Sequence, residues 1–304
     1  MLTLFLPLFL LVLLLGLPVF FATLFAPGLM LLLSDMGRDV PMLFRNIYNG
    51  IDSFPLMAIP FFMLAGEVMN RGGITIRLVN LSQVFIGHVR GGLAHVNIMS
   101  SMLFAGMSGS AVADTSALGS MLIPAMEKNG YSRRFAAAIT AASSVIGPII
   151  PPSGIMIIYA YTMEVSVAAL FAAGVIPGLL IGLGLMAVTA LLAKKHNFPV
   201  AREKASWQEK GAATKAAFLP LLTPIIILGG ILFGVFTPTE ASAIAVGYAL
   251  VLSIWVMKTV KLSDLPQIFT RSAMSSAAVL LIVGAAIAFK TVVSLSHSAE
   301  DLAN

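Results

Sequence analysis

Long apolar runs limit the folds that this sequence can adopt. Residues 2–33 carry no charged side chain, and further apolar runs occupy 166–193, 216–236 and 241–257. A helix that crosses a membrane needs about 20 apolar residues, which each run approaches or exceeds. Only 10% of the residues are charged, whereas soluble domains have about 25%. We therefore predict an all-α polytopic membrane protein, because continuous runs, unlike alternating ones, do not favour a β-barrel.

The distribution of charge indicates which side of the membrane one segment occupies. Residues 194–215 hold six Lys and Arg residues and two Glu residues. Because cytoplasmic loops are rich in Lys and Arg, we expect a basic cytoplasmic loop here. The same rule accounts for the net charge of +5, so nucleic acid is not an expected partner. The chain has no cysteine, and its histidines lack the spacing of a metal site, so we expect no cofactor.

Residues 70–92 are predicted to form an amphipathic helix in the membrane interface. Basic residues recur there among apolar ones at roughly helical spacing: Arg71, Arg77, His88 and Arg90. Basic amphipathic helices of this kind lie with their apolar face in the headgroup region. A solvated loop is the alternative, because glycines interrupt the segment.

Two pairs of segments suggest an internal repeat. The stretch from Pro41 (PMLFRNIYNGIDSFPLMAIPFFMLAG) is similar to that from Pro266 (PQIFTRSAMSSAAVLLIVGAAIAFKT), and 4–20 is similar to 217–233. Two weakly similar halves are a feature of secondary transporters, although apolar segments also resemble one another by chance. A second copy of the polar motif described next would fall beyond the end of this sequence. We therefore expect the second repeat to be incomplete here.

The polar motif GMSGSAVADTS at 106–116 contains a break at 106–110, which two arms flank, 94–105 and 111–126. At a rise of about 1.5 Å per residue the arms extend about 18 and about 24 Å. Neither is expected to cross a hydrocarbon core of about 30 Å, so we predict a re-entrant hairpin. Non-helical backbone at that depth is tolerated only where protein or a water-filled cavity surrounds it, which indicates a site at the tip.

Asp114 is the one charged residue of the sequence between Arg90 and Glu127. A carboxylate inside a membrane is costly and therefore suggests a function. The alternative is a purely local role, in which Asp114 and the neighbouring hydroxyls cap the second arm. Both roles are compatible, since a helix N-terminus at the membrane midplane also attracts anions.

A second irregular segment is VIGPIIPPSGIM at 145–156. Pro148, Pro151 and Pro152 lack an N–H and clash with the preceding turn, so a helix must break here. Unwound backbone carbonyls, together with the hydroxyl of Ser153, are ligands suited to Na⁺. A simple proline kink between two ordinary spans is the alternative.

Three classes of function are considered. An ion-coupled secondary transporter explains the hairpin, the broken helix and the repeat; without a GxxxxGK[ST] motif the chain is no ATP-driven pump by itself. The GxSG pattern at 106–109 suggests an intramembrane serine hydrolase, but a serine nucleophile needs a base. The sequence has no histidine between His95 and His196. A channel or a non-transporting structural membrane subunit is the third class.

Three motifs in order resemble the large permease (M) subunit of tripartite ATP-independent periplasmic (TRAP) transporters: AGMSGSAVADTSALGSMLIPAM, SSVIGPIIPPSGIMIIYA and GGILFGVFTPTEASAIAVGYAL. The resemblance covers essentially the whole chain. It implies a non-enzymatic symporter of the bacterial inner membrane that imports organic acids, C4-dicarboxylates or sugar acids such as sialic acid, with Na⁺ as the coupling ion. It also implies membrane lipid and two proteins as partners, a periplasmic substrate-binding protein and a small membrane subunit of four helices.

The resemblance further implies an inverted-repeat fold with an elevator mechanism, in which a transport domain slides against a scaffold. The implied parts are scaffold helices of the first repeat at 1–69, an arm helix at 70–92, half of the transport domain at 93–165, a transmembrane helix at 166–193, the basic loop at 194–215 and the start of the second repeat at 216–304. The substrate would contact Ser108, Gly109, Ser110, Asp114 and Thr115. Na⁺ would contact Ser108, Ser110, Gly147, Pro148, Pro151 and Ser153. The family's second hairpin and second proline-broken helix have no counterpart in this sequence.

Overall fold

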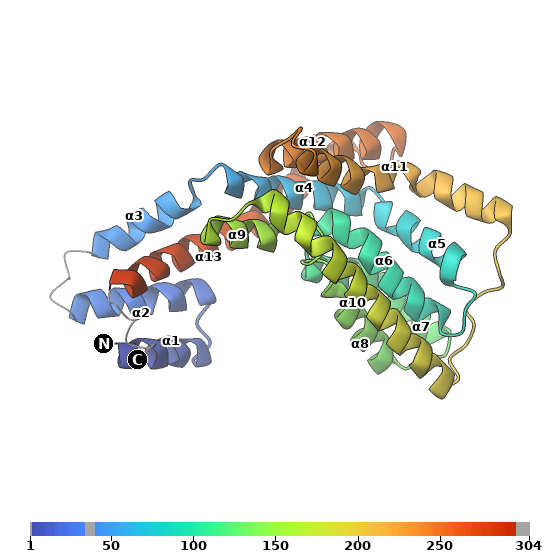
Figure 1. Ribbon diagram of the computed structural model, residues 1–304, viewed down its shortest axis with the longest axis horizontal. Helices are drawn as coiled ribbons and strands as arrows, with labels where there is room; N and C mark the ends of the chain where they lie inside the picture. The colour runs from blue at the N-terminus through green and yellow to red at the C-terminus, as the bar shows by residue number, and fades with distance from the viewer. Residues whose placement is uncertain (1, 34–39, 296–304) are drawn as a thin grey trace. The chain divides into compact units, whose positions relative to one another are not determined.

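The computed structural model describes residues 2–33 and 40–295, which form helices joined by short connections (Figure 1). These described residues contain no named strand, only an isolated antiparallel bridge between Arg90 and Val200. The predicted all-α class is therefore confirmed. By its internal contacts the chain divides into two compact units, Met1–Leu56 with Ala273–Asn304 and Met57–Ser272.

The first unit contains three helices of the N-terminal region and most of the last helix. Its elements are α1 (Leu2–Leu14), α2 (Val19–Leu33), α3 (Val40–Ile51) and the part of α13 (Leu265–Leu295) that begins at Ala273. The apolar run at 2–33 is divided because Gly16 adopts a φ of +83° and Pro18 follows it. Buried aliphatic side chains form the core: Leu31, Leu43, Ala288 and Val292.

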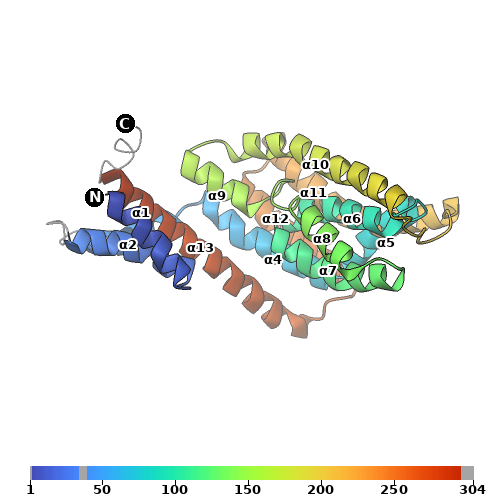
Figure 2. The same ribbon diagram turned by 90° about the horizontal axis from the view of Figure 1, so that it is seen from below.

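The second unit contains the remaining helices and both irregular segments singled out in the sequence. The elements are α4 (Ala58–Arg71), α5 (Ile74–Ile86), α6 (Gly92–Ser108), α7 (Ala111–Lys128), α8 (Arg133–Ser144), α9 (Gly154–Met163), α10 (Val167–Lys195), α11 (Trp207–Leu232) and α12 (Pro238–Val251), followed by a π-helical turn, Leu252–Val256. Helices α6, α7 and α8 contact one another, and α10 runs beside α6 (Figures 1 and 2). On another side α4 packs on α12 and α5 packs on α11.

Two predicted boundaries change in the structure. Within the segment expected to be one helix at 70–92, α5 covers only Ile74–Ile86, because the left-handed Gly73 precedes it and Gly87 ends it. Its place in the membrane interface stays a prediction. The expected loop at 194–215 is wrong in its extent. Helix α10 continues to Lys195, and α11 begins at Trp207 because Ser206 and Glu209 form a reciprocal capping box.

Four helices of the described residues are long and apolar enough to cross a membrane, and a fifth crossing is possible if α3 and the 55–71 segment count as one broken span. The four are 167–195, 207–232, 238–256 and 262–294. The unit boundary at Leu56 does not follow the implied scaffold range of 1–69, since α4 belongs to the second unit by its contacts. The functional division of the chain stays a prediction, and the end of the implied second repeat, 296–304, lies outside the described residues.

Candidate functional site

The polar motif forms the tip of a helical hairpin. Helix α6 ends at Ser108, Gly109 adopts a left-handed conformation with φ of +59°, and α7 begins after Ser110. Glycine is favoured at this C-terminal position because a left-handed residue carries no Cβ penalty there. The hydroxyl of Ser110 accepts a hydrogen bond from the Ala113 N–H at 3.3 Å, so Ser110 caps α7. The capping role considered for Asp114 therefore falls to Ser110.

Asp114 lies in the first turn of α7 and is fully buried. Its Oδ1 accepts a hydrogen bond from the Ser108 hydroxyl, which also accepts a long bond of 3.4 Å from the Ser110 N–H. Its Oδ2 is buried and has no hydrogen-bond partner in the described part of the chain. Burying a carboxylate is costly unless a charge or donor compensates it. The tip thus contains an acceptor oxygen whose partner is not supplied by the described residues.

The proline-rich segment interrupts the helical structure between α8 and α9, as predicted. Helix α8 ends at Ser144, and residues 145–153 form turns before α9 begins. Ser153 is fully buried and caps α9 through a 3.4 Å bond from the Met156 N–H. The peptide bond between Pro151 and Pro152 is cis. Pro151 and Pro152 are buried, whereas Pro148 is half-buried.

The hairpin tip and the broken segment lie in direct contact. A methyl group added to Gly147 would be 2.9 Å from Asp114 Oδ2 and 3.1 Å from the Ser110 carbonyl carbon. A methyl group on Gly109 would collide with the carbonyl oxygen of Pro152 and lie 3.0 Å from Ser153 Cα. Two glycines therefore allow the two irregular backbones to approach each other. The arrangement places hydroxyl, carboxylate and carbonyl oxygens of both segments in one small region.

Helix α4 approaches the same tip from another direction. A methyl group on Gly66 would lie 3.6 Å from the Met107 carbonyl oxygen and from Ser108 Cα. Gly66 lies in the range expected for the scaffold, 1–69, and was not predicted to contribute to the site. The tip is consequently enclosed by α4 as well as by the broken segment.

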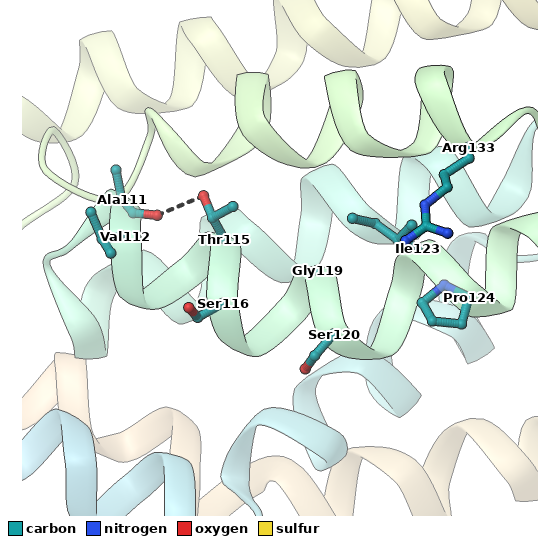
Figure 3. A pocket seen from close by; sticks show the side chains of 9 residues that line it. All are labelled: Ala111, Val112, Thr115, Ser116, Gly119, Ser120, Ile123, Pro124 and Arg133. Atoms are coloured by element: carbon teal, nitrogen blue, oxygen red, sulfur yellow. Dashed lines mark hydrogen bonds between the residues drawn. The ribbon is translucent and has the colours of Figure 1, made fainter.

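Thr115 does not join the other predicted site residues. It is exposed, its hydroxyl donates to the Ala111 carbonyl oxygen at 2.8 Å, and it lines a groove along α7 (Figure 3), whereas Asp114 is buried. The groove has a volume of about 590 Å³ and contains the hydroxyls of Ser116 and Ser120, with Arg133 at its far end. The structure therefore separates Thr115 from Ser108, Gly109, Ser110 and Asp114.

The sequence interpretation missed a buried polar ladder between α6 and α8. The Asn97 side-chain amide donates to Thr140 Oγ1 at 2.7 Å, and Ser143 Oγ donates to Asn97 Oδ1 at 3.2 Å. The Ser101 hydroxyl bonds to Ser143 at 2.9 Å, and the Ser144 hydroxyl donates to the Thr140 carbonyl at 2.7 Å. A usable signal was present, because Asn97-x-x-Ser-Ser and Thr140-x-x-Ser-Ser have the same helical spacing. The ladder ties together the helices that lead to the two irregular segments.

These features define a class of protein before any comparison is made. Apolar helices long enough to span a membrane, a hairpin with a polar tip and a broken helix against it are characteristic of secondary transporters. The chain belongs to the DctM component family of tripartite ATP-independent periplasmic transporters, whose family model matches residues 6–304. It is accordingly a multi-pass protein of the bacterial inner membrane.

Comparison with curated proteins gives relatives with several names. The chain is 42% identical to the sialic acid TRAP transporter large permease protein SiaM of Vibrio cholerae over 289 residues, 95% of this chain and 67% of the relative. It is 47% identical to the uncharacterized protein YgiK of Salmonella typhimurium over 246 residues, 81% of this chain and 56% of the relative. It is 38% identical to the C4-dicarboxylate TRAP transporter large permease protein DctM of Pseudomonas aeruginosa, covering 85% of this chain and 60% of the relative. The chain thus spans about two thirds or less of these relatives.

Proposed function

We propose that this chain is the permease of a Na⁺-coupled secondary transporter that imports organic acids. The observation that carries the proposal is the buried Asp114 Oδ2, which has no partner among the described residues and faces the broken segment at Gly147. A cation bound between the hairpin and the break would compensate this carboxylate. Hard cations take oxygen ligands, and broken helices supply such ligands in secondary transporters.

The proposed Na⁺ site uses oxygens from both segments. Its candidate ligands are those that the sequence suggested: Ser108 and Ser110 of the tip, and Gly147, Pro148, Pro151 and Ser153 of the break. The contacts of Gly147 and Gly109 with the opposite segment support this grouping. Asp114 adds a buried carboxylate beside it. Na⁺ is then the coupling ion, and no further cofactor is proposed.

The proposed substrate is a small organic acid, either a C4-dicarboxylate or a sugar acid such as sialic acid. Relatives named for both kinds of substrate support this class. We place the substrate at the tip, beside Ser108, Gly109, Ser110 and Asp114. The groove that contains Thr115, Ser116, Ser120 and Arg133 extends the candidate surface, because hydroxyls and a guanidinium suit hydroxylated carboxylates. Arg133 is largely exposed, and its contact with Glu127 is a loose 3.9 Å.

The proposed mechanism is an elevator movement of the hairpin and broken helix as one body. The polar ladder from Asn97 to Ser144 supports this, because it joins α6 to α8. In this proposal the α6–α7 hairpin is re-entrant, α5 acts as an arm helix, and a periplasmic binding protein and a small four-helix membrane subunit are the partners. Membership of a tripartite periplasmic transporter family supports both partners.

The serine hydrolase alternative is not favoured by the geometry. The hydroxyl of Ser108 donates to Asp114, and none of the described histidines is hydrogen-bonded to it. A serine nucleophile is normally activated by an adjacent base oriented by a third group. Labelling of Ser108 by a fluorophosphonate probe would nevertheless favour the hydrolase.

The proposed transport is tested in proteoliposomes that contain the permease with its small subunit and binding protein. Labelled sialic acid and succinate are offered under an inward Na⁺ gradient, with an equal K⁺ gradient as the control. We expect saturable uptake of one of the two acids under the Na⁺ gradient only. Equal uptake under both gradients would contradict Na⁺ coupling, and non-saturable flux would favour a channel.

A further inference from the structure

A pocket of about 520 Å³ lies between the α5–α6 connection and the C-terminal part of α10. Its walls are apolar, formed by Ile86, Val89, Met186 and Ala190. Arg90, Lys194 and His95 supply the polar groups, and none of the described residues that line the pocket is acidic. His95 lies near the start of α6, whereas the hairpin tip follows the end of that helix, and the pocket takes no part in the proposed transport site.

Arg90 and Lys194 are both exposed, and neither forms an ion pair within the described ranges. Two unpaired cations beside one apolar cavity repel each other unless an anion lies between them. A third group adds to this pattern. His95 is only 6% exposed, and its buried Nδ1 has no partner among the described residues.

The backbone around the pocket is fixed by specific contacts. The Gly91 N–H donates to the Pro199 carbonyl at 3.1 Å, and Arg90 forms a bridge with Val200. A methyl group on Gly91, whose φ is +77°, would lie 2.7 Å from Ala193 Cβ. These contacts attach the α5–α6 connection to the end of α10. Helix α6 begins at Gly92, so the positive end of its dipole lies beside the same cations.

Apolar surface continues from the pocket along α10. Leu183, Val188 and Leu191 of this helix are exposed, and only 17% of its most apolar stretch is buried. Such a helix is solvated by acyl chains in a membrane. A ligand that fits therefore has an anionic head between the cations and an apolar tail along α10.

We propose that this pocket binds the phosphate headgroup of an anionic phospholipid. The phosphate oxygens lie between Arg90 and Lys194 and accept a hydrogen bond from His95, while the acyl chains follow α10. Free inorganic phosphate has the same head chemistry but no tail, so it leaves the apolar wall uncovered. The basic segment at 196–206 continues from Lys194, as expected of a region near the headgroups.

The proposal is tested by native mass spectrometry of the purified full-length permease, titrated with dioleoylphosphatidylglycerol. Each of Arg90→Gln and Lys194→Gln should weaken binding about five-fold, and the double variant about 25-fold, as expected for one surface cation each. Lys195→Gln is the matched control, because it removes the neighbouring charge outside the pocket. All substituted side chains are exposed, and the Arg90 bridge is formed by backbone, so folding should be retained.

Three outcomes would overturn the assignment. The first is equal weakening by Lys194→Gln and Lys195→Gln, which would indicate unspecific charge attraction. The second is equally tight binding of dioleoylphosphatidylcholine, whose headgroup is zwitterionic. The third is displacement of the lipid by millimolar inorganic phosphate, which would identify a free phosphate as the ligand.

Discussion

Gly147 packs directly against Asp114, so a methyl group on this glycine would lie 2.9 Å from the carboxylate Oδ2. Asp114 lies in the first turn of α7 and Gly147 in the break after α8, so the rest of α7 and all of α8 separate them in the chain. The glycine leaves space beside an oxygen whose partner is not among the described residues. In the proposed transporter this space lies next to Na⁺.

The first prediction concerns this contact. Gly147→Ala should destabilise the protein by about 1–3 kcal/mol, because overpacking displaces Asp114 or the backbone of Ser110 and Ser144. It should also lower the apparent Na⁺ affinity in uptake assays. Gly154→Ala is the control, since its methyl group would meet only Ile59 at 3.8 Å. Equal effects of the two substitutions on Na⁺ dependence would argue against a site between hairpin and break.

The second prediction separates the charge of Asp114 from its shape. Asp114→Asn keeps an acceptor for the Ser108 hydroxyl but removes the buried charge. We expect Na⁺-dependent uptake to fall at least about 100-fold. Removing one partner of a buried ion pair costs about 3–5 kcal/mol, and Asp114 is the proposed partner of Na⁺. Without Na⁺ the variant should be as stable as the parent protein or more stable, because an uncompensated buried charge is gone.

Thermal unfolding with and without Na⁺ measures this linkage. A ligand that binds the folded state raises its stability in proportion to the logarithm of ligand concentration over Kd. The parent protein should gain stability on addition of Na⁺, and Asp114→Asn should not. Glu164→Gln is the matched control, because this carboxylate is exposed at the end of α9. If Na⁺ stabilised Asp114→Asn as much as the parent, the carboxylate would have no part in the site.

The third prediction uses two serine caps of nearly identical geometry. Ser153 caps α9 and Ser166 caps α10, with bonds of 3.4 and 3.3 Å from the third backbone N–H of each helix. Replacing either by Ala should cost about 1 kcal/mol of stability through the lost cap. Only Ser153→Ala should also reduce Na⁺ affinity, because Ser153 is buried against the hairpin tip. A parallel loss of Na⁺ affinity in Ser166→Ala would show that helix stability alone explains the effect.

The two irregular segments could be predicted because their causes are local. Three prolines within five residues break a helix in any tertiary context, and Gly109 ends α6 through its own backbone freedom. The membrane class could also be predicted, because it follows from composition and does not depend on tertiary packing. The capping box of Ser206 and Glu209 was equally local, and it could have shown that the basic loop is shorter than expected.

The contact of Gly147 with Asp114 could not be predicted in this way. It depends on the packing of α7 against α8, which no local pattern specifies. The turn of α7 that buries Asp114 also exposes Thr115, so neighbouring residues of one motif face different environments. Assignment of α4 to the second unit likewise rests on its packing with α12, a helix far from it in the sequence.

The fourth prediction concerns the polar ladder that the sequence interpretation overlooked. Asn97 donates to Thr140 at 2.7 Å, and both side chains are fully buried. Asn97→Leu or Thr140→Val should each destabilise the protein by about 1–3 kcal/mol, because a buried partner is left unsatisfied. The double variant should lose less than the sum of the two, which a double-mutant cycle of thermal stability measures.

The ladder should also affect the rate of transport, separately from its effect on stability. If α6 and α8 move together during transport, a weakened ladder should slow uptake at saturating substrate while leaving the Na⁺ concentration for half-maximal uptake unchanged. Thr270→Val is the control, because its exposed hydroxyl bonds only to the Pro266 carbonyl of its own helix. Additive effects in the cycle, or an altered Na⁺ dependence, would mean that the ladder does not act as a connection separate from the ion site.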